Sequence, residues 1–257
     1  MLQSSDSPVP LYYQVYVTIR QRILDGLYLP SEAMPTEQEL VDQFNVSRIT
    51  VRRAMDELQA EGLIQRKRGR GTFVVPKKFA SRLHTNISGL LENLVNMGLK
   101  TKVDLIEFGY APATPDVREQ LELPKNAIVQ RSVRVRSYKN EPLSHLVAYL
   151  PEDIGRSFEE ADLKAQPLLG LLERAGVKVD SADQTISARV ADSDVATLLH
   201  VPVGTALIFI TRVVRDDQGR PVELIRGLYR PDRYEYGMKV VRVTQNDARV
   251  WCPSSRS

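Results

Sequence analysis

Residues 36–75 read TEQELVDQFNVSRITVRRAMDELQAEGLIQRKRGRGTFVV, and this stretch decides the fold of the N-terminal third of the chain. Thr36 and Glu39 have the spacing of a capping box, which predicts the start of a short helix. Ser47 then provides a second N-cap, which predicts another helix over residues 48–60. Two short helices separated by about three residues form a helix-turn-helix.

The second helix of this pair has two different faces. With a turn of about 100° per residue, its apolar side consists of Val51, Ala54, Met55 and Leu58. Its other side carries Arg48, Ile49, Arg52 and Arg53. Recognition helices place their N-terminal residues in the major groove, where arginine pairs with guanine through two hydrogen bonds. A solvated cationic face is the alternative, and the crowding of arginines into the first two turns favours DNA binding over it.

The next residues, 63–75, change from a helical period to two short strands around a basic turn that contains glycine. A hairpin in this place is a wing. We expect its tip residues Arg68, Gly69 and Arg70 to reach phosphate or the minor groove, because glycine lets the backbone approach closely.

The chain before this stretch continues the same pattern. Apolar residues within 11–28 recur at helical spacing, so a further helix is predicted there, and residues 1–9 are expected to form a disordered lead. Residues 45–82 carry ten Lys and Arg against three Asp and Glu, whereas residues 1–44 carry two Arg against six acids. A basic block in a chain of net charge +3 is typical of a phosphate-binding surface. A disordered basic tail is the alternative, but the regularly spaced apolar residues favour a folded surface.

Composition narrows the class of protein. A length of 257 residues suits one small domain and one of about 150 residues. The single cysteine, Cys252, excludes an internal disulfide and suits a reducing cytoplasm. No apolar run approaches the roughly 20 residues of a membrane span. The histidines, His84, His145 and His200, are far apart, so we expect no metal site and no cofactor.

Residues 10–75 closely resemble the DNA-binding domain of the GntR family of bacterial regulators. The resemblance rests on PLYYQVYVTIRQRILDG and on MPTEQELVDQFNVSRITVRRAMDELQAEGLIQRKRGRGTFV. It implies DNA contacts from Gly69 with its neighbours on the wing, and from four residues of the recognition helix, namely Ser47, Arg48, Thr50 and Arg52. Family members often have a DNA-contacting arginine where this chain has Gln38, and we expect the change to weaken or redirect one contact.

The rest of the chain predicts an α+β domain built on an antiparallel sheet, joined by a linker at residues 76–85. Strands are predicted at 103–110, 128–138, 143–150, 177–190, 206–215 and 221–230. Short helices are predicted at 88–97, 117–121, 167–175 and 192–199. The stretches 117–124 and 195–202 resemble each other, and each precedes a strand, a turn and a second strand. Two related helix–hairpin units with a cleft between them are therefore one interpretation, and chance similarity of short motifs is the other.

Residues 86–243 resemble the effector-binding domain of the HutC branch of the GntR family, whose fold is like that of chorismate lyase. The motifs that carry the resemblance are VRVR at 133–136, EPL at 141–143, YLP at 149–151, GRPVE at 219–223 and YRPDRY at 229–234. The resemblance implies a homodimer, a palindromic operator and a small-molecule effector. The tail, residues 244–257, lies beyond the family pattern.

The strand at 128–138 suggests where an effector binds. Alternation places Arg134 and Arg136 on one face, where they form a two-pronged anion site, although they can also simply decorate a solvated strand. A helix start at Gly89, Leu90 and Leu91 offers backbone N–H groups to an anion. The resemblance adds two more residues, because sugar-phosphate-sensing relatives use the positions of Glu223 and Tyr229 for the rest of the ligand.

Three positions depart from the sugar-phosphate pattern. Leu146 stands where a glutamate is common, and Pro167 and Leu169 stand where those relatives have serine and tyrosine. The loss of three polar groups predicts an effector with fewer hydroxyl groups, such as a carboxylate or another small anion with an apolar body.

The sequence thus predicts a cytoplasmic DNA-binding regulator, in the role of a repressor that an anionic effector releases from its operator. Two other functions are considered. A lyase-like enzyme is disfavoured, because no nucleophile–base pair, metal cluster or phosphate loop is visible. An architectural DNA-binding protein without an effector is the second alternative, and a small molecule that changes thermal stability would exclude it.

Overall fold

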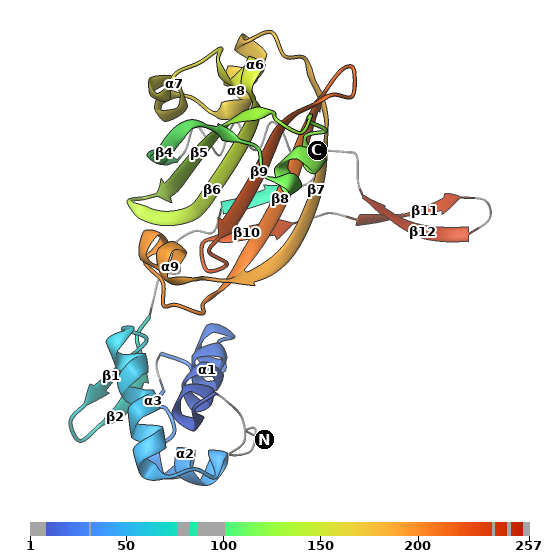
Figure 1. Cartoon of the computed structure of the whole chain (residues 1–257). Coiled ribbons are helices and arrows are strands. Elements are labelled where there is room, and N and C mark those ends of the chain that lie inside the picture. The colour runs from blue at the N-terminus through green and yellow to red at the C-terminus, as the bar shows by residue number, and fades with distance from the viewer. Residues whose placement is uncertain are drawn as a thin grey trace. The chain divides into compact units, whose positions relative to one another are not determined.

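The structure of the chain is a computed structural model that describes residues 9–30, 32–76, 83–86, 101–237, 240–245 and 248–253 (Figure 1). It divides into two compact units, Met1–Phe79 and Ala80–Ser257. Across the described ranges, no helix is long and apolar enough to cross a membrane. The boundaries predicted for the linker and the tail stay predictions.

The first unit is a winged helix-turn-helix. Its elements are α1 (Leu11–Leu24), α2 (Glu37–Phe44), α3 (Arg48–Ala60), β1 (Ile64–Lys67) and β2 (Gly71–Val74). Strands β1 and β2 pair antiparallel to form the wing. The three helices bury one common core, in which Ile19, Leu40, Val51 and Leu58 are fully enclosed. The predicted helix pair and wing are therefore confirmed.

Helix α1 ends earlier than its apolar spacing predicts. The spacing extends to residue 28, but the helix stops at Leu24, and Asp25 caps it by donating its N–H to the Gln21 carbonyl at 2.8 Å. Gly26 then has a φ of +75°, a left-handed conformation in which the right-handed helix cannot continue. Tyr28 still packs against the core from the following turn, which explains the apolar residue beyond the helix end.

The second unit contains a six-stranded antiparallel sheet in the order β4-β5-β6-β9-β8-β7. The strands are β4 (Lys102–Pro112), β5 (Ile128–Tyr138), β6 (Glu141–Pro151), β7 (Val179–Val190), β8 (Ala206–Asp216) and β9 (Pro221–Tyr229). The hairpins β5–β6 and β8–β9 meet along β6 and β9 at the centre of the sheet. Two hairpins are thus present, and the relation between them stays a prediction. The first hairpin turns at Lys139 and Asn140, which both have positive φ and lie between the predicted strands 128–138 and 143–150.

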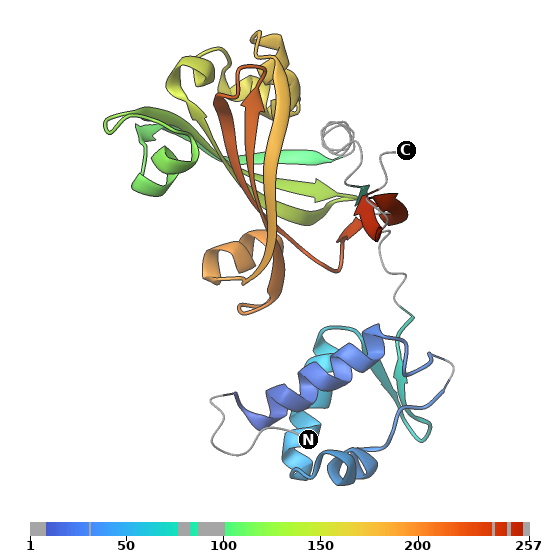
Figure 2. The ribbon, with the colours of Figure 1, turned by 90° about the vertical axis from the view of Figure 1, so that its right-hand side faces the viewer.

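Helices cover both faces of this sheet. Figure 2 shows α5 (Pro115–Gln120) and α9 (Ser193–Leu199) on one side, where they pack on residues such as Leu224 and Leu207. The other face is covered at one end by α6 (Glu152–Gly155), α7 (Glu160–Ala165) and α8 (Leu168–Arg174). Helices α5, α8 and α9 were predicted. Helices α6 and α7 were not, because four to six residues are too few to show a helical period.

Two further pairings involve strands that the sequence does not predict. Strand β10 (Tyr234–Gly237) pairs in parallel with β3 (Leu83–Asn86), and β11 (Val240–Gln245) forms a hairpin with β12 (Ala248–Pro253). Tyr234 of β10 is buried and stacks on Tyr229, with ring centroids 4.5 Å apart. Strand β10 therefore covers the second end of the sheet face whose first end lies under α6–α8. The predicted helix at 88–97 lies outside the described residues.

Close packing at Gly227 generates a prediction. A Cβ on this residue would lie 2.5 Å from the Tyr229 ring and 2.8 Å from Leu146 Cδ2, and the Tyr229 ring cannot move away freely because it is stacked on Tyr234. We expect Gly227→Ala to lower the free energy of unfolding of this unit by about 1–3 kcal/mol, as overpacking does. Urea denaturation measures it.

Gly109→Ala is the matched control, because Gly109 lies in β4 of the same sheet and a Cβ there has no neighbour within 4 Å. That variant should match the wild type or gain up to about 1 kcal/mol, since alanine loses less conformational entropy on folding. Equal urea midpoints for the two variants would contradict the prediction, because they would show that the Tyr229 ring moves aside for the added Cβ.

Candidate DNA interface and effector site

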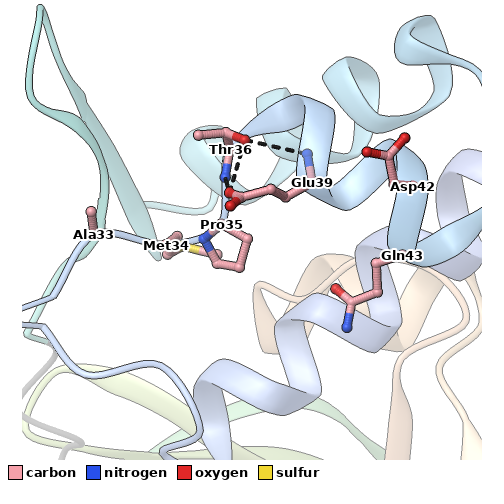
Figure 3. Close-up of a pocket in the computed structure, with 7 residues that line it drawn as sticks. All are labelled: Ala33, Met34, Pro35, Thr36, Glu39, Asp42 and Gln43. Atoms are coloured by element: carbon pink, nitrogen blue, oxygen red, sulfur yellow. Dashed lines mark hydrogen bonds between the residues drawn. The ribbon is translucent and has the colours of Figure 1, made fainter.

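A capping box fixes the start of α2. The Thr36 N–H donates to Glu39 Oε2 at 2.7 Å, and the Glu39 N–H donates to Thr36 Oγ1 at 3.2 Å (Figure 3). Thr36 donates to Glu39 Oε2 both from its N–H and, at 2.8 Å, from its Oγ1, and these two hydrogen bonds lower the pKa of Glu39. Its carboxylate therefore stays charged at the positive end of the helix. At the other end Asn45 adopts a left-handed conformation, with φ 52°, which turns the chain into α3.

Figure 3 also shows an open hollow beside α2. Its lining includes Ala33, Met34, Pro35 and Gln43, and its two charged residues are the carboxylates Glu39 and Asp42. Such a hollow repels phosphate rather than attracting it. DNA is therefore expected to meet other parts of this unit.

Helix α3 presents its arginines to solvent. Ser47 caps it by accepting a hydrogen bond from the Thr50 N–H at 3.2 Å. Its buried residues are the four that the sequence predicts, Val51, Ala54, Met55 and Leu58. Arg48, Arg52 and Arg53 are exposed, and so is Ile49, which is 81% exposed. The fold thus holds a cationic helix face clear of the core.

The three arginines of α3 differ in their contacts. The Arg53 guanidinium lies 3.7 Å from the centroid of the Tyr12 ring, a cation–π contact that ties α3 to α1. Arg48 Nη2 donates to Gln38 Oε1 of α2 at 2.9 Å. The Arg52 side chain has no hydrogen bond or ion pair with any described residue. Arg52 is therefore the most available of the three for a partner outside the chain.

The wing is anchored at its base and has cations at its tip. Arg66 Nη1 of β1 donates to Asp56 Oδ1 of α3 at 2.6 Å, which holds the hairpin against the recognition helix. Arg68 and Arg70 are exposed and form no hydrogen bond or ion pair through their side chains with described residues. Gly69 between them has a φ of +73°, so the tip can turn tightly.

The second site lies on the face of the sheet between α6–α8 and β10. Ser132, Arg134 and Arg136 alternate along β5 and share this face. In the cross-strand register, Arg136 is opposite Ser144 of β6, which is opposite Tyr229 of β9. Glu223 also belongs to β9, an even number of residues from Tyr229 and thus on the same face. The sheet therefore brings together the four predicted residues Arg134, Arg136, Glu223 and Tyr229.

Arg134 is the most unusual residue of the chain. Its side chain is 1% exposed, and Nε, Nη1 and Nη2 all lack a hydrogen-bond partner within the described part of the structure. Burial lowers its pKa to about 10, with a smaller effect from the like charge of Arg136, so the guanidinium is still charged at neutral pH. A buried charge without an acceptor is strongly unfavourable. The three nitrogens of Arg134 are therefore open to a hydrogen-bond acceptor, such as an anion, that the described residues do not supply.

The neighbours of Arg134 complete a charged but enclosed site. Arg136 Nη1 donates to Thr101 Oγ1 at 3.0 Å, and burial lowers its pKa as well. Burial raises the pKa of Glu223 more strongly than the cations of Arg134 and Arg212 lower it. Burial likewise raises the pKa of Tyr229, which keeps its hydroxyl protonated and able to donate.

Sequence reasoning missed three residues of this face. Ser132 and Ser144 are fully buried, and their hydroxyl groups have no partner among the described residues. Arg212 of β8 donates from Nε to Gln184 Oε1 at 2.9 Å. Alternation from Arg134 could have identified Ser132. Ser144 and Arg212 lie on other strands, so only the cross-strand register reveals them.

The remaining positions considered for the effector site are Gly89, Leu90, Leu91 and Leu146. Gly89, Leu90 and Leu91 lie outside the described residues, so the helix start proposed for anion binding stays a prediction. Leu146 is buried between Arg134 and Gly227 in the register, and it gives this part of the face an apolar surface. Within the described ranges, no group of three or more potential metal ligands occurs.

Comparison with known protein families gives a match for each of the two units. Residues 11–74 match the model of the bacterial regulatory proteins of the gntR family, and residues 96–235 match the UTRA domain. The second match alone covers more than half of the chain. The chain belongs to the GntR family. It is a DNA-binding transcriptional regulator with an effector domain, and its relatives are regulators rather than enzymes.

Three similar proteins illustrate the range of this GntR-family regulator's relatives. One from Escherichia coli, assigned as a fructoselysine utilization operon transcriptional repressor, is 34% identical over 85% of this chain and 91% of its own length. The histidine utilization repressor of Pseudomonas aeruginosa is 26% identical over 82% of this chain and 83% of its own length. The ligand-binding domain of a GntR-family regulator from Bordetella bronchiseptica is 30% identical, with a TM-score of 0.52, over 54% of this chain and 89% of that domain.

The unpaired guanidinium predicts an unusual stability change. Arg134→Met keeps most of the volume but removes the buried charge, so we expect the effector unit without ligand to gain about 1–3 kcal/mol in free energy of unfolding. Arg131→Met is the control, because Arg131 lies on the same strand, is ion-paired with Glu107 and is partly exposed. That variant should lose no more than about 1 kcal/mol. A larger loss for Arg134→Met than for the control, measured by urea denaturation, would contradict an unsatisfied charge.

The raised pKa of Glu223 predicts a pH dependence of stability. Its carboxyl group binds a proton more tightly in the folded protein than in the unfolded chain, so its contribution is fully present below the unfolded pKa and is lost as the pH rises through the folded pKa. Relative to Glu223→Gln, which cannot ionise, the wild type should therefore lose free energy of unfolding as the pH is raised from about 4 toward neutral. A constant difference between the two proteins, measured by urea denaturation across this range, would contradict the shift.

Proposed function

We propose that this regulator is a repressor whose operator is released when a small anion binds at Arg134. The observation that carries the effector half of the proposal is the fully buried Arg134 guanidinium without a partner among the described residues. Proteins keep such unfavourable groups where function uses them. The E. coli and P. aeruginosa relatives are both named as repressors, which supports repression as the sign of control.

The DNA-binding residues are proposed to have two roles, reading bases and contacting the DNA backbone. Arg48 and Arg52 read base edges in the major groove, because they lie in the first two turns of α3 and are exposed. Of the other proposed DNA-binding residues, Gln38 lies beside Arg48 and accepts a hydrogen bond from it. The rest mainly position the unit on phosphate and sugar, namely Ser47, Thr50, Arg53, Arg68, Gly69 and Arg70. Of these, Arg68 and Arg70 have the clearest support, since their side chains have no partner in the described part of the chain.

The operator is proposed to be a palindrome bound by a homodimer. A two-fold symmetric protein presents two recognition helices, which requires half-sites about one helical turn apart, roughly 34 Å, or a multiple of it. Effector binding must favour one arrangement of the dimer over another, since a ligand without differential affinity shifts no equilibrium.

The effector is proposed to be a carboxylate or another small anion with an apolar body. Two buried cations, Arg134 and Arg136, call for negative charge, and the protonated Tyr229 hydroxyl can donate a hydrogen bond. The floor beside Arg134 is Leu146, which offers no polar group to a sugar. An anion that carries few hydroxyl groups satisfies both features.

Selection of genomic DNA fragments by the purified protein tests the proposal. The wild type should enrich a two-fold symmetric site, and Arg48→Ala and Arg52→Ala should each lose base discrimination equivalent to about 1–3 kcal/mol. Arg156→Ala, which removes an exposed arginine at the C-cap of α6 in the other unit, should enrich the same site as the wild type. Binding that is sensitive to salt but blind to sequence would instead indicate an architectural DNA-binding protein.

The selected site also tests the effector class. Carboxylates with apolar bodies should release the wild type from this DNA at micromolar to millimolar concentrations and leave Arg134→Met bound. Release by micromolar glucose 6-phosphate would overturn the apolar-body assignment. Release of Arg134→Met and the wild type by the same anion at equal concentrations would overturn the site itself.

A further inference from the structure

The two helices of the helix-turn-helix are joined by a chain of side-chain hydrogen bonds on their exposed surface. Gln38 lies in the first turn of α2, and its Oε1 accepts a hydrogen bond from Arg48 Nη2 at 2.9 Å. Its Nε2 donates to Asp42 Oδ1, one helical turn later, at 3.1 Å. The amide of Gln38 thus uses both of its ends within the protein.

The chemistry of the three side chains dictates the direction of these hydrogen bonds. A carboxylate has no proton to donate, so Asp42 can pair only with the NH₂ end of the Gln38 amide. The carbonyl end must then point away from Asp42, toward Arg48, and a guanidinium can only donate. The direction of the amide therefore follows from its two partners.

An arginine at position 38 could not accept the hydrogen bond that Arg48 donates to Gln38. Its guanidinium has no acceptor atom, and its charge would lie beside the charge of Arg48. The glutamine of this chain is uncharged and accepts, so it can hold Arg48 rather than compete with it. A base-reading arginine that is held before DNA arrives loses less side-chain entropy on binding.

We propose that Gln38 is a positioning residue, and that Asp42 and Gln38 together orient the Arg48 guanidinium for its base. This inference rests on the proposed function, in which Arg48 reads a base edge. Only one N–H of Arg48 is used by Gln38, which leaves the remaining N–H groups for DNA. Arg52 has no such partner in the described structure, so the base that Arg52 reads is independent of Gln38.

Selection from a library of randomised operator half-sites by the full-length protein tests this assignment. Gln38→Ala should lower discrimination about fivefold to tenfold at the base position where Arg48→Ala also loses it, and nowhere else. Asp42→Ala should produce a smaller loss at the same position, since the amide is no longer fixed. The salt dependence of binding should be unchanged in Gln38→Ala, because no cation is removed.

The double variant separates positioning from direct reading. In an Arg48→Ala background, Gln38→Ala should change the base preference no further, because Gln38 then has nothing to orient. Gln43→Ala is the matched control, since Gln43 is an exposed glutamine of α2 without a side-chain hydrogen bond to described residues. It should select the same sites as the wild type. Thermal unfolding of each variant at the wild-type midpoint confirms the fold.

Three results would overturn the inference. A change of preference at a base that Arg48→Ala does not affect, or a further change in the Arg48→Ala background, would show that Gln38 reads a base itself. Identical selection by Gln38→Ala and the wild type would show that Arg48 needs no positioning. Failure of the proposed function has a different signature, since the wild type would then show no base preference at all.

Discussion

A charged guanidinium enclosed in the sheet without an acceptor is the constraint on which the effector unit depends. Arg134 is 1% exposed, and its three nitrogens have no partner within the described residues. Several kcal/mol of unfavourable burial must therefore be offset elsewhere. The apolar clusters at the two ends of the same sheet face, under α6–α8 and under β10, supply that stability, so the charge is held between two well-packed regions.

The central strand pair makes the site possible. Strands β6 and β9 belong to different hairpins, and their register places Ser144 opposite Tyr229 and Leu146 opposite Gly227. Gly227 leaves room for the Tyr229 ring to lie over the sheet. An anion bound at Arg134 would contact residues of both hairpins, and so could stabilise one arrangement of the two. A site shared between two structural units is the simplest way for a small ligand to alter a whole domain.

Much of the first unit could be predicted from sequence, because its signals are local. The capping box of Thr36 and the cap of Ser47 each act within three residues, and the wing follows from a change of period after Gly62. The end of α1 was placed too late, because Tyr28 packs on the core from a turn rather than from the helix. The six strands of the large sheet in the second unit are also predicted, since each is long and alternates or is continuously apolar.

The rest depends on contacts between distant residues. Local alternation put Arg134 and Arg136 on one face, but Ser144 and Arg212 join them only through the cross-strand register. The parallel pair of β3 and β10 joins segments about 150 residues apart, and four-residue strands carry little pattern of their own. The hydrogen bond between Gln38 and Arg48 likewise needs the crossing of α2 and α3.

Side-chain NMR of Arg134 tests the central claim most directly. The Nε–H resonance, assigned by its loss in Arg134→Met, can be followed while benzoate and sulfate are added to the full-length protein. We expect an anion that releases DNA to shift this resonance downfield, as a new hydrogen bond does, and to leave the Nε–H of Arg131 on the opposite face unchanged. An anion that releases DNA without moving the Arg134 resonance would show that the effector binds elsewhere.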